Sequence, residues 1–160
     1  QTEAALFREA LFITPQGGEG SYLRVRHDGR RVTVTHKAPV NTLSRMETEF
    51  GADDFEAAVA LFHRAGLPLL MHREKHRTSY RLGDAVVSID QYPGIPALAE
   101  VEAPDAAAVA AACERLGLDA GRHFAGGVLE VMAHYGLPQQ TGCTLAFTPA
   151  ERTRLQAEHH

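Results

Sequence analysis

The segment of residues 69–82 constrains the fold most strongly, because four of its odd-numbered positions are basic. In a β-strand, alternate side chains point to opposite faces, so these four cations share one face of one predicted strand. They are Arg73, Lys75, Arg77 and Arg81. Like charges on one face of a strand repel each other. The segment therefore requires either full exposure to water or an anionic partner.

Five further segments also alternate and are predicted to be strands: residues 22–27, 31–37, 45–50, 85–90 and 97–102. Asp28-Gly29 predicts a tight hairpin between the first two. After a short helical pattern over residues 4–11, the order is β-β-β-α-β-β-β-α-α. Asp53 is expected to cap the first helix of this order and Gly66 to end it. The absence of a βαβ pattern indicates an α+β protein with an antiparallel sheet and helices at its back.

Length and composition predict one domain over residues 1–156, and residues 157–160 look like the start of a purification tag. The net charge of −4 argues against nonspecific nucleic-acid binding. No apolar run approaches the ~20 residues of a membrane span. Cys113 and Cys143 lie in unrelated contexts, which indicates free thiols in a reducing, cytoplasmic compartment. The sequence does not determine the oligomeric state, and a homodimer remains open.

Charged side chains on the predicted strands are sorted by sign. Three strands carry basic residues on one face: Arg24, Arg26, Lys37, Arg73, Lys75, Arg77 and Arg81. The other three carry carboxylates: Glu47, Glu49, Asp90, Glu100 and Glu102.

Two interpretations of this sorting stay open. A single sheet with helices on its apolar face would leave the charged face in water. Alternatively, a barrel with the charged faces inward would enclose the cations beside the two glutamate pairs. Such an interior is costly when empty. It would be balanced by a polyphosphate held by the basic side chains and by Mg²⁺ or Mn²⁺ held by the glutamates.

Six sequence elements together resemble the CYTH superfamily, also called the triphosphate tunnel metalloenzymes. They occur in the family's order and approximate spacing: Tyr22-Leu23-Arg24-Val25-Arg26, Thr35-His36-Lys37, Arg45-Met46-Glu47-Thr48-Glu49, Lys75-His76-Arg77, Ser88-Ile89-Asp90 and Glu100-Val101-Glu102. The resemblance covers roughly residues 20–120. It implies a closed, antiparallel, eight-stranded β-tunnel with helices packed outside.

The resemblance also implies roles for individual residues. The triphosphate would be bound by Arg24, Arg26, Lys37, Lys75 and Arg77, with Arg45 beside them. Divalent metal would be coordinated by Glu47, Glu49, Glu100 and Glu102. Lys75, Arg77 and Asp90 would act in catalysis, with Asp90 orienting the basic groups. Arg73 and Arg81 share the charged face without matching a family position.

One element of the family is not found here: an N-terminal E-x-E-x-K strand. Either it lies outside these residues or the protein is a degenerate, non-catalytic member, and the retained elements favour the first. The expected function is metal-dependent hydrolysis of inorganic, nucleoside or thiamine triphosphate. The alternatives are a class IV-type adenylate cyclase and a module that binds polyphosphate or nucleotide without turnover.

Overall fold

The computed structural model describes residues 3–15, 18, 20–40, 45–119, 124, 128–138 and 140–157. The first seven strands are β1 (Glu3–Ile13), β2 (Tyr22–His27), β3 (Val32–Pro39), β4 (Arg45–Ala52), β5 (Leu69–Leu82), β6 (Ala85–Gln91) and β7 (Leu98–Glu102). The remaining elements are α1 (Phe55–Arg64), α2 (Ala106–Arg115), α3 (Val128–His134), β8 (Cys143–Leu145) and α4 (Pro149–Ala157). The predicted α+β class is confirmed.

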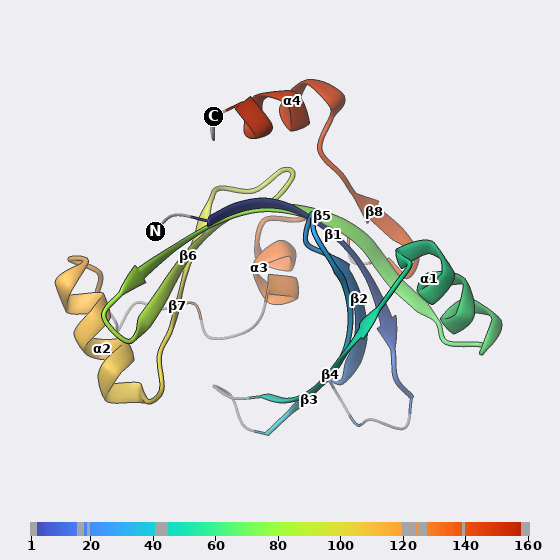
Figure 1. The fold of residues 1–160 in the computed structure, drawn as a ribbon, viewed down its shortest axis with the longest axis horizontal. Helices are drawn as coiled ribbons and strands as arrows, with labels where there is room; N and C mark the ends of the chain where they lie inside the picture. Colours follow the sequence, from blue (N-terminus) through green and yellow to red (C-terminus); the bar gives the residue numbers. More distant parts are fainter. Residues whose placement is uncertain are drawn as a thin grey trace.

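All eight strands belong to one strongly curved sheet, which forms an arch in Figure 1. Its order is β4-β3-β2-β1-β5-β6-β7, and neighbours along this path are antiparallel. The short strand β8 pairs in parallel with β5. Within the described residues, β4 and β7 end the path and are not hydrogen-bonded to each other. The sheet thus has the expected eight strands, arranged as an open arch.

The helix predicted for residues 4–11 is wrong, because these residues belong to β1. This strand lies between β2 and β5 at the centre of the sheet. A central strand is covered on both faces and therefore has apolar residues on both. On the convex side Ala10 and Phe12 are fully buried, and on the concave side Leu11 is fully buried. The resulting continuous apolar run resembles a buried helix in sequence.

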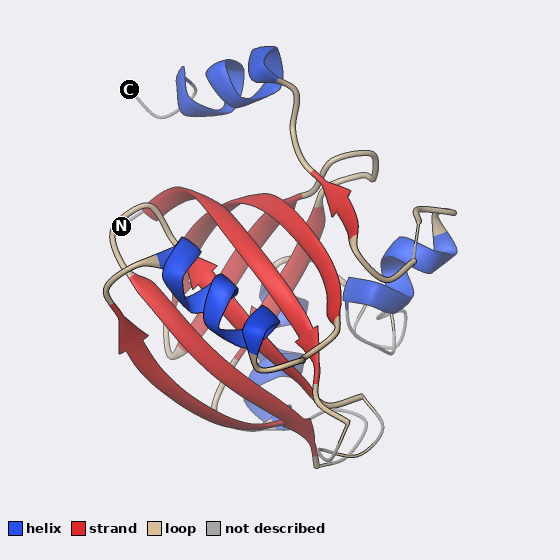
Figure 2. Cartoon of the chain, turned by 90° about the vertical axis from the view of Figure 1, so that its right-hand side faces the viewer, coloured by secondary structure: helices blue, strands red, loops and turns tan. Residues whose placement is uncertain are grey.

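Helices α1, α2 and α4 lie outside the arch (Figure 1). In Figure 2, α1 crosses the outer surface of the strands. It packs Phe55 and Val59 against Val25, Val34 and Phe12. Asp54, and not the predicted Asp53, caps α1 by accepting a 2.6 Å hydrogen bond from the Ala57 N–H. Asp54 directly precedes the first helical residue, where an N-cap is required.

Helix α3 lies beneath the arch, on the concave side of the sheet (Figure 1). The expectation that all helices pack outside is therefore wrong for α3. Its Met132 is fully buried in a cluster with Leu11, Met71, Tyr92 and Leu145. Leu11 and Met71 are cross-strand neighbours on β1 and β5. This apolar cluster covers one end of the concave face.

The C-terminal segment is anchored on the convex side by Glu74 of β5. Its buried carboxylate accepts hydrogen bonds from the Phe147 N–H at 3.0 Å and from Arg152 Nε at 2.9 Å. Neither β8 nor α4 was predicted, because the tail has only weak periodicity. Both cysteines are free thiols, as predicted. No helix in the described part of the chain is long and apolar enough to cross a membrane.

Candidate functional site

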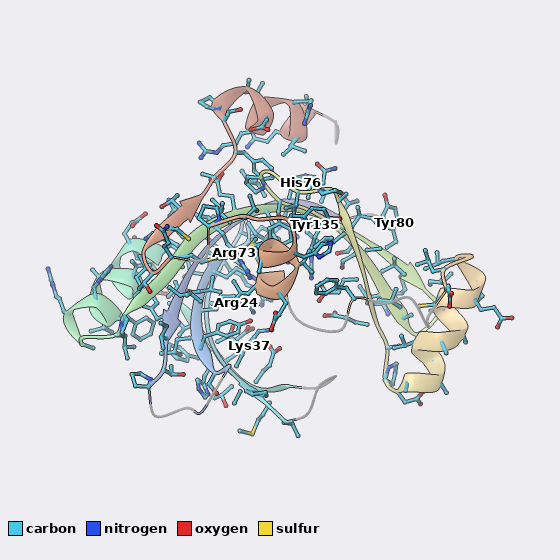
Figure 3. The ribbon with its side chains drawn as sticks, turned by 180° about the vertical axis from the view of Figure 1, so that it is seen from behind. Arg24, Lys37, Arg73, His76, Tyr80 and Tyr135 are labelled. Atoms are coloured by element: carbon cyan, nitrogen blue, oxygen red, sulfur yellow. The ribbon has the colours of Figure 1, made fainter. Side chains whose placement is uncertain are left out.

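The candidate site is the concave face of the sheet beside α3. Strand alternation brings basic side chains from three strands onto this face: Arg24 and Arg26 of β2, Lys37 of β3, and Arg73, Lys75 and Arg77 of β5. Figure 3 shows Arg24, Lys37 and Arg73 under the arch. The cations of β2 and β3 lie close to those of β5 because only one strand, β1, lies between β2 and β5. Arg24, Arg73 and Lys75 are buried.

Glu9 on β1 is the centre of this face and is fully buried. It is the cross-strand neighbour of Arg26 on one side and of Arg73 on the other. Arg26 donates from Nε to Glu9 Oε1 at 2.6 Å, and Arg73 donates from Nε to Oε2 at 2.5 Å. Arg24 Nε lies 3.9 Å from Oε1. Burial alone would raise the pKa of Glu9, but these cations and Lys75 hold its pKa well below the usual range.

Asp90 on β6 organises a second group of charges. It accepts hydrogen bonds from Lys75 Nζ at 2.8 Å and, in a two-pronged contact, from Arg77 Nε and Nη2, each at 2.6 Å. Arg77 also contacts Glu100 on β7. Burial raises the pKa of Asp90, but the hydrogen bonds and charges of its two partners outweigh it and leave the pKa lowered. Asp90 thus has contacts that suit its expected orienting role.

The glutamates of β4 contact the same face from its edge. Glu47 pairs with Lys37, and Glu49 accepts a 2.7 Å hydrogen bond from Thr35 Oγ1. Arg24 Nη2 in turn donates to Thr35 Oγ1 at 3.3 Å. A chain of polar contacts therefore runs from the buried Arg24 of β2 through Thr35 to Glu49 on the exposed edge strand.

Positive charge is in excess in the interior of this face. Six cations (Arg24, Arg26, Lys37, Arg73, Lys75 and Arg77) face two buried carboxylates, Glu9 and Asp90, while the partly exposed Glu47 and Glu100 pair with Lys37 and Arg77 at the edges. Burial and neighbouring cations lower the pKa of Arg24 and of Lys37. Burial also lowers the pKa of Lys75 to about 8, although Glu9 and Asp90 oppose the shift. An additional anion nearby would stabilise the charged forms of these three side chains, whose pKa values are lowered.

Two buried N–H groups also point to an anion. Arg24 Nε and Arg73 Nη1 have no hydrogen-bond partner among the described residues. A buried charged donor without an acceptor is costly. A phosphate, with several acceptor oxygens, would satisfy such donors.

The predicted metal ligands have suitable donor chemistry, since Mg²⁺ and Mn²⁺ prefer carboxylate oxygens. Glu47, Glu49 and Glu100 are 43%, 42% and 50% exposed in their side chains, and Glu102 is exposed. However, these pairs lie on β4 and β7, the two ends of the strand path. Among the residues that the structure describes, no three His, Cys, Asp or Glu side chains gather as a metal site.

Most predicted anion-binding residues thus lie on one face, while the two glutamate pairs lie at its edges. Arg81 is exposed, and the side chain of Arg45 lies outside the described part of the structure. Sequence reasoning missed Glu9 and Tyr92. Glu9 was missed because its segment, residues 4–11, was predicted to be a helix. Tyr92 is buried next to Arg73 and Lys75, and nothing in its sequence neighbourhood marks it.

Together, the fold and the site define an α+β protein whose curved sheet presents a buried cationic face suited to a multiply charged anion. The chain belongs to the CYTH domain family, which its residues 10–120 match. The resemblance noted in the sequence is therefore confirmed at the level of the family. No curated protein matches the sequence.

Solved structures show the same fold. A conserved hypothetical protein from Pyrococcus furiosus is 22% identical, with a TM-score of 0.71 over 80% of this chain and 83% of that chain. A protein from Bacillus halodurans, provisionally described as an adenylate cyclase, is 17% identical, with a TM-score of 0.55 over 93% and 82%. A protein from Vibrio parahaemolyticus with the same provisional description is 15% identical, with a TM-score of 0.54 over 96% and 85%.

Proposed function

We propose that this protein is a metal-dependent phosphohydrolase that binds the triphosphate group of its substrate on the concave face of the sheet. The observation that carries the proposal is the excess of positive charge at the centre of this face, where the buried Arg24, Arg73 and Lys75 lie with Arg26 and Arg77 around two buried carboxylates, Glu9 and Asp90. A triphosphate carries several negative charges along a short chain, which matches basic groups spread over three strands. The substrate class is inorganic triphosphate or a nucleoside or thiamine triphosphate.

The basic side chains would bind the phosphate chain and stabilise the charge that develops during hydrolysis. Arg24, Arg26 and Lys37 would hold phosphoryl oxygens on the β2–β3 side, with Arg45 beside them. Lys75 and Arg77 would offset the charge that develops on the bridging oxygen when its bond to the terminal phosphorus breaks and water adds. Their shared contacts with Asp90 keep them oriented before the substrate arrives, so little reorganisation is needed.

We assign the divalent ion to the glutamates at the two edges: Glu47, Glu49, Glu100 and Glu102. Such an ion, Mg²⁺ or Mn²⁺, would supply Lewis-acid stabilisation of phosphoryl charge. Both pairs lie on the same side of the sheet as the cations, because Glu47 contacts Lys37 and Glu100 contacts Arg77. Closure of the arch into the family's tunnel would bring β4 and β7 toward each other.

Phosphate release from tripolyphosphate, ATP and thiamine triphosphate, with and without Mg²⁺ or Mn²⁺, tests the proposal. The full chain should release phosphate only with metal. Glu47→Gln and Glu100→Gln should lower this activity strongly, whereas Glu114→Gln, an exposed position on α2, should not. Release that does not depend on metal, or full activity in both site variants, would contradict the assignment.

Two other functions are distinguished by the same reactions. A binding module without turnover is favoured by the dispersed glutamates, and it would bind tripolyphosphate tightly without releasing phosphate. An adenylate cyclase would form cyclic AMP and pyrophosphate from ATP. The provisional descriptions of the Bacillus and Vibrio proteins name this activity, but at their level of identity they support the fold alone.

A further inference from the structure

We infer that Arg73, held in place by Glu9, is an additional phosphate ligand at the end of the concave face that α3 covers. This inference rests on the proposed function and deepens it. Arg73 matches none of the six sequence elements that resemble the family.

Arg73 is almost completely buried, with 3% of its side chain exposed. Its Nε donates to Glu9 Oε2 at 2.5 Å, which fixes one edge of the guanidinium group. The Cζ of Arg73 lies over the Tyr92 ring, 5.7 Å from its centroid. Its Nη1 is buried and has no acceptor among the described residues. One nitrogen of an otherwise fixed guanidinium group is therefore available to a ligand.

The position of Arg73 indicates which part of a ligand it would contact. Along the concave face of β5, Arg73 lies between Lys75 and Met71. Met71 belongs to the apolar cluster of α3, which covers the face beyond this point. A phosphate chain that extends along Lys75 and Arg77 would therefore end at Arg73. We assign Arg73 to the phosphoryl group at one end of the chain.

A purely structural role for Arg73, as the counterion of Glu9, does not account for the surroundings. Glu9 Oε1 already accepts a hydrogen bond from Arg26 Nε at 2.6 Å, and Arg26 Nη2 lies 2.5 Å from the same oxygen. One guanidinium group would neutralise this carboxylate. Burial lowers the pKa of Arg73, but Glu9 outweighs it and raises the pKa. The single charge of Glu9 is nevertheless shared by two arginines, with Arg24 at 3.9 Å as a third. A buried surplus of this kind costs stability unless an anion offsets it.

The experiment separates the ligand role from the counterion role by comparing two variants that both lack Glu9. In Glu9→Gln, Arg73 is retained and Arg26 keeps an acceptor. In Glu9→Gln/Arg73→Met, both partners of the buried Arg73–Glu9 pair are neutral; Arg26 and Arg24 lose the charge of Glu9 equally in both variants, so the comparison isolates Arg73, and melting temperatures check that both variants fold. Tripolyphosphate binding is measured by titration calorimetry at fixed salt. Arg81→Met, on the same strand but exposed, controls for the loss of one positive charge.

Tripolyphosphate should bind the double variant about tenfold or more weakly than it binds Glu9→Gln, the loss expected for one charge-assisted hydrogen bond. Arg81→Met should bind within about twofold of the wild type, since a solvated charge contributes little. Arg73→Lys keeps a charge for Glu9 but lacks Nη1, and it should also bind weakly while its melting temperature stays near that of the wild type.

Equal tripolyphosphate affinity in the double variant and in Glu9→Gln, or wild-type affinity in Arg73→Lys, would show that Arg73 is only the counterion of Glu9 and not a phosphate ligand. That result would leave the proposed function intact, because the wild type would still bind tripolyphosphate. A wild-type protein that binds no tripolyphosphate would instead remove the proposed function, and the inference with it.

Discussion

Lys75 should make triphosphate binding depend on pH in a way that its position predicts. Burial lowers its pKa from 10.5 to about 8 in the free protein. A bound polyanion favours the charged ammonium form and should return the pKa toward its ordinary value. Below pH 8 the ammonium form is present before and after binding, so Lys75 adds no pH dependence there. Above pH 8 the free protein must take up a proton in order to bind.

The affinity should therefore fall above pH 8 by up to tenfold per pH unit. The fall would end near pH 10.5 and total at most about two and a half orders of magnitude. In the absence of ligand, the same shift has the opposite effect on stability. Because the unfolded chain binds more protons between pH 8 and 10.5, the free energy of unfolding should rise across this range, by about 3 kcal/mol at most.

Titration calorimetry with tripolyphosphate from pH 7 to 10 measures the effect, and Lys75→Arg is the matched control. Arginine stays charged over this range. Tripolyphosphate itself titrates within it, so the informative quantity is the ratio of wild-type to Lys75→Arg affinity at each pH. This ratio should be constant below pH 8 and fall above it. A ratio that stays flat up to pH 10 would refute the reasoning.

Three further predictions concern the supports of the site and of the fold. Asp90→Asn leaves buried cations short of a counterion and should cost about 3 kcal/mol, or about 6–12 °C in thermal unfolding; an unchanged melting temperature would contradict the buried pairing. Glu74→Gln should increase amide hydrogen exchange in α4, because its anchor loses the charged acceptor, while exchange in α1 stays as in the wild type. Phe12→Ala should lower the free energy of unfolding by about 3–5 kcal/mol in urea titrations, since the ring is fully buried in the convex core; a loss below 1 kcal/mol would disprove that packing.

Strands β2 to β7 and helices α1 and α2 could be predicted from sequence because their local signals agree with their surroundings. The hairpin at Asp28-Gly29, the long strand β5 and the helix that Asp105 caps are all present. Each of these strands has two different faces, and that difference is what a pattern with a period of two records. The family followed from the same strands, since the basic and acidic pairs lie on them.

The centre of the sheet could not be predicted for the opposite reason. Strand β1 is covered on both faces, so its sequence shows no alternation, and its alanines favour a helix locally. Glu9 is a single acidic residue within that segment, and only the neighbouring strands reveal that it faces two arginines. Such contacts join residues 17 and 64 positions apart in the chain. Location in the cytoplasm, homodimerisation and the metal-binding role of the glutamates remain predictions.

The two buried carboxylates explain how six cations can share one concave face in a folded protein. Glu9 and Asp90 each receive groups from more than one direction, and each keeps a charged form that burial alone would disfavour. They offset part of the repulsion, but burial still outweighs their attraction at Lys75 and leaves its pKa lowered. A face balanced completely by its own carboxylates would gain nothing from an anion. The partial balance allows the sheet to fold and leaves a net charge that favours a polyphosphate ligand.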